Sequence, residues 1–239
     1  AASRGYEREG GGAARDLDQD GWRELLLPQG GGFAERDWKV THLDRLCRNA
    51  GDGRCSDVTT QAGLNSNGFG QGATVGDFNC DGFPDLLVAN IGGNRLLINN
   101  GDGTYSDETR TAGVGGGEWS VSSVLADLNG DGLPDLYVVN YLEGQDVFLP
   151  SCPPNAPVAR AGGPGDFSAA QDRLFLNSGD GRFRDVTDSS GVTQAKGKGL
   201  GAIVADFDGT GRLDLFIAND TQSNFLFRNQ TARTDSGLT

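Results

Sequence analysis

One sixteen-residue segment recurs along the chain, and this repeat constrains the fold more than any other feature. The copies read ARDLDQDGWRELLLPQ at 14–29, VGDFNCDGFPDLLVAN at 75–90, LADLNGDGLPDLYVVN at 125–140 and VADFDGTGRLDLFIAN at 204–219. A second segment, built around Gly-Asp-Gly, follows the first three copies at 45–59, 95–109 and 173–187. The two landmarks keep nearly the same spacing, with a basic period of about 50 residues. The chain is therefore a series of similar units.

Each unit is expected to contain four short β-strands. In the second unit these are 73–77, 85–89, 95–99 and 104–109. The run Leu86-Leu87-Val88 is continuously apolar, which is typical of a strand covered on both faces. Asparagine and the Gly-Asp-Gly triplets supply turns, because Asn and Gly tolerate positive φ. Four strands in about 50 residues predict the blade of a β-propeller, and no helical periodicity competes.

The sequence thus predicts an all-β fold in which four four-stranded propeller blades are visible. The expected boundaries are a tail at 1–12 and blades at 13–60, 61–110, 111–188 and 189–239. A truncated fourth blade stays open as an alternative. A Pro/Gly-rich insertion at about 141–171 lengthens the third blade. Loops of this length are usually functional or disordered, so a recognition role for the insertion stays open.

An acidic loop with the pattern D-x-[DN]-x-[DT]-G-x-x-[DE] opens each copy of the repeat. Alternate oxygen ligands on a tight loop converge on one cation, and the Gly at position 6 permits the sharp bend. Oxygen ligands alone favour Ca²⁺, so up to four Ca²⁺ ions are predicted. The candidate ligands are Asp16, Asp18, Asp20 and Glu24; Asp77, Asn79, Asp81 and Asp85; Asp127, Asn129, Asp131 and Asp135; Asp206, Asp208, Thr210 and Asp214.

Position 12 of the loop separates this pattern from an EF-hand, which needs an acidic residue there. That position is apolar in all four copies and falls within the following strand: Leu27, Val88, Val138 and Ile217. The calcium loop is therefore expected between two strands. Thr210 replaces an Asp, so the fourth loop is expected to bind most weakly. Solvated Asp-Gly turns are the alternative, but the fourfold ligand spacing favours the metal.

Charge excludes several classes of function. The formal net charge is −13, and the four loops hold 13 carboxylates, which would repel one another strongly without a cation. Nucleic acids and anionic membranes require clustered positive charge, so neither is an expected partner. No stretch approaches the length of a membrane span. Residues 1–20 carry no signal peptide and the chain contains no Met, so we expect a mature form or an excised fragment.

These residues resemble the FG-GAP/VCBS repeats, which form the blades of integrin-α-type propellers. The sequences at 197–229 and 10–31 are most similar to ASPIC/UnbV-type proteins, a group that includes cartilage acidic protein and bacterial secreted relatives. The resemblance implies a secreted, extracellular or periplasmic platform stabilised by calcium. It also implies closure with about seven blades, so that four blades alone would expose apolar faces at both ends.

Two of the four cysteines are expected to form a disulfide. Cys47 and Cys55 flank the first Gly-Asp-Gly turn on what should be one face of the sheet, and two separate thiols are the alternative. Cys80 and Cys152 would then be the remaining pair. In sister blades the equivalent positions hold the pairs Leu97 and Tyr105, and Phe175 and Phe183.

The function expected from the sequence is non-catalytic binding or adhesion, with an unidentified protein or glycan partner. The carboxylates of the loops are expected to bind metal, and no catalytic Ser-His or Cys-His pair can be built with credible partners. The alternative is a carbohydrate-processing or other catalytic propeller. It would use acid and base carboxylates outside the loops, such as Asp146, Asp166 or Asp220.

Overall fold

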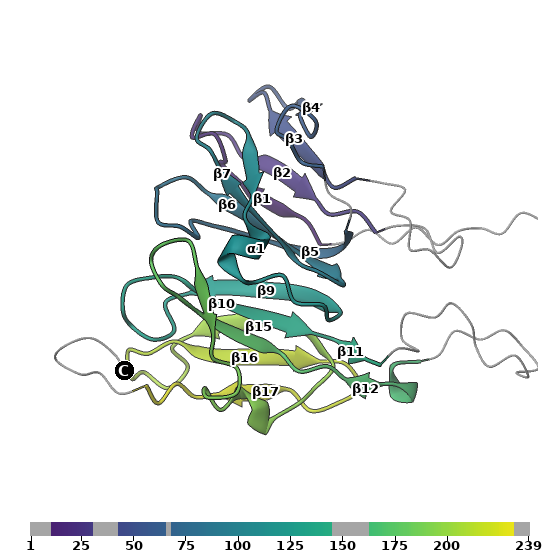
Figure 1. The fold of residues 1–239 in the computed structure, drawn as a ribbon, viewed down its shortest axis with the longest axis vertical. Coiled ribbons are helices and arrows are strands. Elements are labelled where there is room, and N and C mark those ends of the chain that lie inside the picture. Colours follow the sequence, from purple (N-terminus) through teal and green to yellow (C-terminus); the bar gives the residue numbers. More distant parts are fainter. Residues whose placement is uncertain (1–10, 31–42, 66–67, 145–162, 232–239) are drawn as a thin grey trace, which may run out of the picture.

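Antiparallel β-sheet makes up almost all of the regular structure in the computed structural model, which describes residues 11–30, 43–65, 68–144 and 163–231 (Figure 1). Sheet I contains β1 (Ala13–Arg15), β2 (Glu24–Leu27), β3 (Arg45–Asn49) and β4 (Cys55–Asp57). Sheet II contains β5 (Phe69–Gly76), β6 (Asp85–Ile91), β7 (Arg95–Asn99) and β8 (Tyr105–Asp107). Sheet III contains β9 (Ser120–Ala126), β10 (Asp135–Asn140), β13 (Arg173–Asn177) and β14 (Phe183–Asp185). Sheet IV contains β15 (Gly199–Ala205), β16 (Asp214–Asn219) and β17 (Phe225–Phe227).

The expected all-β fold with four-stranded antiparallel sheets is confirmed, with two differences in detail. Sheet IV has three strands within the described residues, where a fourth was expected. In sheet II the last strand ends at Asp107, and a short helix, α1 (Thr109–Ala112), follows it. The reason is local, because Asp107 accepts hydrogen bonds from the Thr109 backbone N–H and from its hydroxyl. These two bonds turn the chain out of the sheet.

The described part of the insertion adds a small ribbon to sheet III. Its strands are β11 (Leu142–Glu143) and β12 (Ser168–Ala169), and a 3₁₀ turn, η2 (Pro164–Asp166), precedes β12. A second 3₁₀ turn, η3 (Val192–Gln194), lies between sheets III and IV. The middle of the insertion, 145–162, lies outside the described residues.

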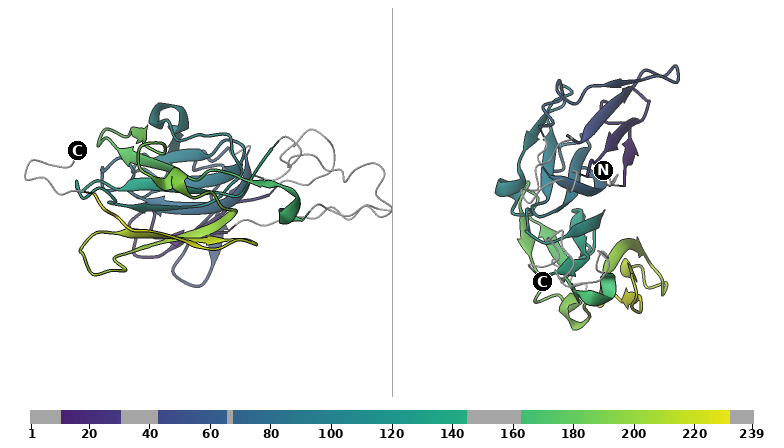
Figure 2. Two further views of the ribbon diagram at one scale, coloured as in Figure 1. Left: turned by 90° about the horizontal axis from the view of Figure 1, so that it is seen from below. Right: turned by 90° about the vertical axis from the view of Figure 1, so that its right-hand side faces the viewer.

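The four sheets follow one another along an open arc (Figure 2, right). The first strand of each sheet lies beside the first strand of the next, so β1, β5, β9 and β15 line the inside of the arc. Backbones approach closely here: a Cβ atom added to Gly72 of β5 would lie 2.4 Å from the Val121 carbonyl oxygen of β9. Thr74 reinforces the contact by donating its hydroxyl to the Ser123 carbonyl at 2.9 Å.

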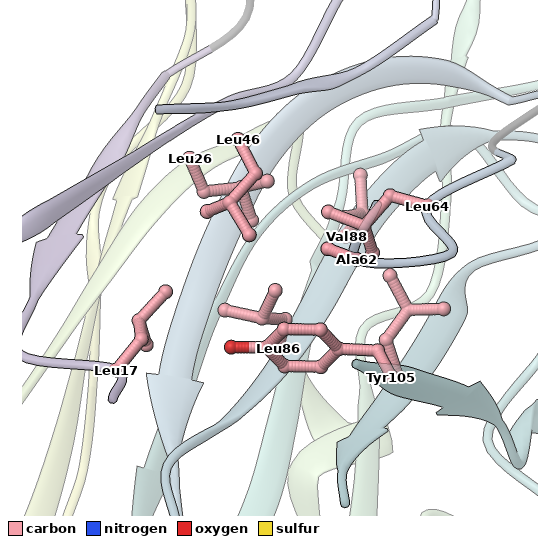
Figure 3. Packing of buried hydrophobic residues seen from close by; sticks show 9 residues of the cluster. Leu17, Leu26, Leu46, Ala62, Leu64, Leu86, Val88 and Tyr105 are labelled. Atoms are coloured by element: carbon pink, nitrogen blue, oxygen red, sulfur yellow. The ribbon is translucent and has the colours of Figure 1, made fainter. Parts of the chain in front are cut away.

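Three apolar clusters fill the spaces between neighbouring sheets. The first, shown in Figure 3, joins Leu26 and Leu46 of sheet I to Leu86 and Val88 of sheet II. Leu87 points the other way, into the cluster between sheets II and III. All three residues of the run 86–88 are fully buried, which confirms that β6 is covered on both faces. A third cluster lies between sheets III and IV.

Candidate metal centres in four acidic loops

The four acidic loops connect the first strand of each sheet to the second, as the sequence predicted. We call them loop I (16–24), loop II (77–85), loop III (127–135) and loop IV (206–214). Position 6 is a glycine with positive φ in every loop. Its φ lies between 88° and 93° in loops I, II and III and is 77° in loop IV. Position 4 is also left-handed, with φ between 60° and 81°. These two residues allow the tight coil of each loop.

The carboxylate at position 9 clamps each loop to its own sheet. Asp85 accepts the backbone N–H of Phe78, at position 2 of the loop, and the N–H of Asn99 in β7, both at 2.8 Å. The same pair of bonds recurs at Glu24, Asp135 and Asp214. All four carboxylates are buried. Position 9 therefore has a structural role that the sequence did not distinguish from metal binding.

An asparagine in the third strand links neighbouring loops. The side-chain amide of Asn99 donates to the Pro84 carbonyl of its own loop at 3.1 Å and to the Leu17 carbonyl of loop I at 2.9 Å. Asn177 and Asn229 repeat this arrangement, reaching position 2 of loops II and III. Sequence analysis interpreted these asparagines only as turn residues. Their recurrence at one place in every unit was the available signal.

Loops I and IV each bring three carboxylates together. In loop I, one oxygen from each of Asp16, Asp18 and Glu24 lies within 4.8 Å of the others, and in loop IV the group is Asp206, Asp208 and Asp214. One oxygen of Asp16 is buried and accepts no hydrogen bond from a described residue. A buried carboxylate oxygen without a donor is costly, and a cation would satisfy it. These residues fit Ca²⁺.

Loops II and III have an asparagine at position 3. Its side-chain amide donates a hydrogen bond to the carboxylate at position 5, where a carboxylate at position 3 would repel it. The Asn79 side-chain amide donates to Asp81 at 2.8 Å, and Asn129 donates to Asp131 at the same distance. Asp77 accepts the N–H groups of Asp81 and Gly82. The carbonyl oxygens of Asn79 and Asn129 remain suitable calcium ligands, but binding would have to compete with these bonds.

The pKa of the carboxyl group at position 9 is raised in loops II and III. Burial raises the pKa of Asp85 and of Asp135 to about 6, although backbone N–H groups partly oppose the shift. The nearby carboxylates at position 5 make a smaller contribution to the same increase. A cation in the loop would favour the ionised form of each carboxyl group. A bound calcium ion and these buried charges would therefore stabilise each other.

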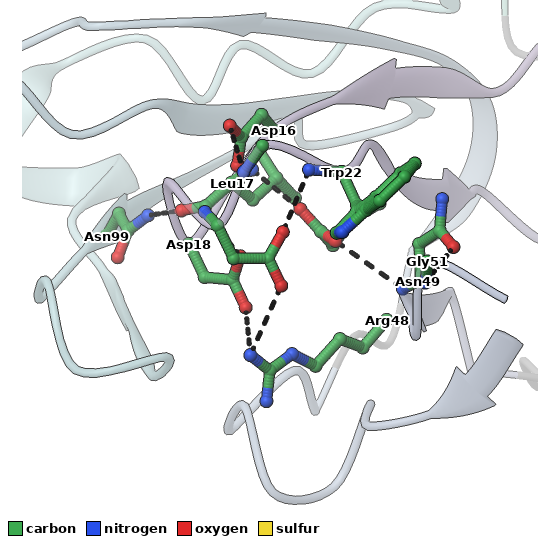
Figure 4. A network of polar contacts seen from close by, with 11 residues as sticks. Asp16, Leu17, Asp18, Trp22, Arg48, Asn49, Gly51 and Asn99 are labelled. Carbon is green, nitrogen blue, oxygen red and sulfur yellow. Dashed lines mark hydrogen bonds and ion pairs between the residues drawn. The ribbon is translucent and has the colours of Figure 1, made fainter.

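Loop I already holds a cation supplied by the protein. Arg48 of β3 lies 2.7 Å from Asp18 and 3.5 Å from Asp20 (Figure 4). The equivalent residues of sheets II and III are Ile98 and Leu176, so loops II and III have no arginine at this position. The guanidinium would compete with Ca²⁺ for two of the four predicted ligands in loop I. The sequence analysis did not anticipate this contact.

Comparison with protein-family models shows three matches, all to the FG-GAP-like repeat, at residues 16–88, 78–138 and 158–217. This chain belongs to the FG-GAP-like repeat family. No curated protein sequence matches it. Among solved structures, it is similar to an Agrocybe aegerita lectin that specifically recognises non-reducing terminal N-acetylglucosamine, with 15% identity and a TM-score of 0.38. The similarity covers 94% of this chain and 66% of the lectin chain, and a TM-score this low supports no inference about a ligand.

The FG-GAP-like units carry no disulfide among the cysteines that the structure describes. Cys47, Cys55 and Cys80 are free, and Cys152 lies outside the described residues. A 47–55 disulfide is not shown, although the two thiols lie within hydrogen-bond reach of each other, and the pairing stays a prediction. Cys47 pairs with Asp57 and Cys55 pairs with Asn49. The cysteines are therefore diagonal neighbours on β3 and β4.

Two of the three carboxylates that a catalytic FG-GAP-like domain would use accept hydrogen bonds in the described structure. Asp166 accepts the backbone N–H of Gly163 at 2.8 Å, within the 3₁₀ turn η2. Asp220 accepts the Tyr141 hydroxyl at 2.6 Å. Asp146 lies outside the described residues. Within the described part of the chain, no helix is long and apolar enough to cross a membrane.

Proposed function

We propose that this FG-GAP-like chain is a calcium-stabilised part of a β-propeller of the ASPIC/UnbV type, with a binding or adhesion role and no catalysis. The proposed location is secreted, extracellular or periplasmic. Its sheets would be propeller blades, and the acidic loops would each hold one Ca²⁺ at one rim of the arc. The partner would be a protein or a glycan.

The single observation that carries the calcium proposal is the convergence of three carboxylates in loops I and IV, together with the unsatisfied buried oxygen of Asp16. The bound ion would hold the connection between the first two strands of a sheet. It would also neutralise carboxylates next to the position-9 clamp. Because the same loop accepts an asparagine from the next sheet, ion binding would stiffen contacts between sheets as well.

Calorimetric titration and thermal unfolding test this proposal. Calcium should bind the folded chain, EDTA should lower the melting temperature, and millimolar Ca²⁺ should restore it far better than Mg²⁺. At a concentration one hundred times Kd, one site adds about 2.7 kcal/mol to the free energy of unfolding. Asp81→Ala or Asp131→Ala should remove one ion each, with a larger effect than Thr210→Ala. Absence of calcium uptake, with melting unchanged by EDTA, would show that the loops are only turns.

The binding role is tested separately, because a calcium-stabilised domain can serve any function. Protein and glycan arrays should be probed with the chain in calcium and again in EDTA. Calcium-dependent capture of a defined protein or glycan is expected. Turnover of an arrayed glycan instead of retention would favour the catalytic alternative.

A further inference from the structure

Two aromatic side chains lie at the edge of sheet III that is opposite the acidic loops. Trp119 precedes β9 and Tyr141 follows β10, so both lie at the strand ends that are farthest from loop III. We call this edge of the arc, which also carries β11 and β12, the far rim (Figure 1). The three apolar clusters of the described residues include neither ring. Both side chains are half-buried, so packing of the core does not account for them.

A row of contacts runs from these rings to the two neighbouring sheets. The Trp119 indole N–H donates to the side-chain carbonyl of Gln71 in β5 at 3.4 Å. The rings of Trp119 and Tyr141 meet edge to face, with centroids 5.5 Å apart. The Tyr141 hydroxyl donates to Asp220, which follows β16, at 2.6 Å. Four half-buried side chains from three sheets thus form one continuous row.

The repeat itself does not require an aromatic pair at this place. The equivalent residues are Phe69 and Ile91 in sheet II, and Lys198 and Asp220 in sheet IV. Sheets II and IV therefore pack against sheet III without two aromatic rings of their own at these positions. The pair of sheet III is a departure from the repeat, which favours a role other than holding the sheets together.

Backbone strain occurs at the same place. Thr221 directly follows Asp220 and has a φ of 57°, a left-handed conformation that β-branched residues rarely adopt. The corresponding residue of sheet II is Gly92, which adopts its φ of 93° at little cost. Strain of this kind is concentrated at functional sites. The carboxylate beside it keeps one acceptor available, because the second oxygen of Asp220 accepts no hydrogen bond from a described residue.

We propose that Gln71, Trp119, Tyr141 and Asp220 form a binding site for one neutral sugar unit of a glycan. This inference rests on the proposed binding role and selects one of its two classes of partner. The C–H face of a sugar ring would lie against the aromatic rings, whose faces carry partial negative charge. Sugar hydroxyls would donate to the second oxygen of Asp220 and to the side-chain carbonyl of Gln71.

The charges at the far rim favour a neutral ligand over a charged one. Lys198 is buried at this rim, and among the described residues its ammonium group donates only to the Pro164 carbonyl. A cationic ligand would be repelled by this ammonium group, which no described carboxylate neutralises. An anionic ligand would be repelled by Asp220 and by a chain whose formal net charge is −13.

Binding of the full chain to immobilised probes in calcium-containing buffer tests the proposal. The probes are neutral glycans that end in hexose or pentose units, one sialylated glycan and one lysine-rich peptide. The unmodified chain should retain a neutral glycan and neither charged probe. Trp119→Ala should weaken retention at least about tenfold, and Tyr141→Phe, which keeps the ring but loses the bond to Asp220, should weaken it less. Ile203→Ala is the matched control, since it shortens an exposed apolar side chain in the middle of β15; it should change nothing.

Circular dichroism and calcium titration of each variant separate a defect at this site from unfolding. Glycan retention that survives Trp119→Ala would overturn the site and leave the binding role intact. If Trp119→Ala does not fold, unchanged retention in Tyr141→Phe would overturn it instead. Retention of only a charged probe, or of no probe, by the folded chain would overturn the assignment to a neutral sugar. Absence of calcium uptake would contradict the calcium proposal alone, and glycan retention would still decide this one.

Discussion

The acidic loops offer oxygen ligands at several positions, but these positions have different structural roles. Position 9 clamps the loop to β3, β7, β13 or to the end of β17, and it does so through backbone donors that need no ion. The side chains at positions 1, 3 and 5 are more exposed than the one at position 9, and they depend more strongly on a cation. This division predicts that substitutions at the two kinds of position will have separable effects.

Asp81→Ala and Asp85→Ala should separate metal binding from structure. Asp81 is exposed, so its loss should abolish binding at loop II and cost less than about 1 kcal/mol of stability in EDTA. Asp85 is fully buried, and its loss leaves the N–H groups of Phe78 and Asn99 without their acceptor. We expect a cost of at least about 2 kcal/mol in EDTA. Urea unfolding would measure both; equal costs in EDTA would contradict the division.

Arg48→Leu should strengthen calcium binding at loop I, because the guanidinium no longer pairs with Asp18 and Asp20. The ion pair is partly exposed, so the expected gain is modest, about two- to fivefold in the Kd of that site. Arg45→Leu is the matched control, since Arg45 lies on the same strand and pairs with Asp57 outside the loop. Calorimetric titration would show the difference. An equal change in both variants would mean a general charge effect.

At the scale of strands, the residue just before the third strand ties the end of the second strand to the start of the third; this residue is buried in sheets II and III and exposed in sheet IV. Asp172 accepts the backbone N–H of Asn140 at 2.7 Å and the Tyr137 hydroxyl at 2.9 Å. In sheets II and IV an asparagine does the same, since Asn94 accepts the N–H of Asn90 and Asn224 accepts that of Asn219. The hydrogen bond is therefore compatible with a neutral amide.

Asp172→Asn should remove a pH dependence of stability. Burial raises the pKa of Asp172 from 3.8 to about 6, although the hydrogen bonds from Asn140 and Tyr137 oppose the shift. Between these values the folded state binds more protons than the unfolded state, so stability falls as the pH rises from about 4 to about 6. The variant should lose the part of this slope that comes from Asp172, while the parts from Asp85 and Asp135 remain, and it should be more stable at neutral pH by about 1–3 kcal/mol.

Urea unfolding across this pH range, in excess calcium, would measure the effect. Asp188→Asn is the control, because Asp188 is an exposed carboxylate just after sheet III. The prediction is wrong if the slope is unchanged in Asp172→Asn or if the control changes it equally.

Contacts between sheets depend on one asparagine per interface. Asn99→Ala should destabilise the fold by about 2–3 kcal/mol, because the Leu17 and Pro84 carbonyls lose their donor in a buried setting. Asn49→Ala is the matched comparison at the open end, where only the Arg23 carbonyl loses a donor. We expect a smaller cost there, measured by urea unfolding in dilute solution. Equal costs would mean that the bond between loops contributes little.

At the scale of the whole molecule, stability should decline from the middle of the arc to its ends. Strands β6 and β10 are buried on both faces, whereas β2 has exposed leucines on one face. In dilute solution, amide exchange should be at least about tenfold slower in β6 and β10 than in β2 and β16. Mass spectrometry of peptic peptides would measure this, and uniform exchange would contradict it.

The sequence alone determined the repeat, the positions of most strands and the geometry of the acidic loops. Strand 95–99 matches β7 to the residue, and position 6 of each loop has the positive φ that its glycine predicts. These features depend on residues close together in the chain. Apolar periodicity, turn residues and ligand spacing all act over a few residues, so a single unit displays them.

Only the tertiary structure decided how the units meet. The asparagine bonds between loops join residues 82, 99 and 101 positions apart, and nothing local indicates which carbonyl each amide reaches. The diagonal register of Cys47 and Cys55 and the entry of Arg48 into loop I likewise depend on strand pairing. Sequence patterns identify which residues face a neighbour. The packing of one sheet against the next decides which atoms they contact, and therefore which carboxylates stay available for a cation.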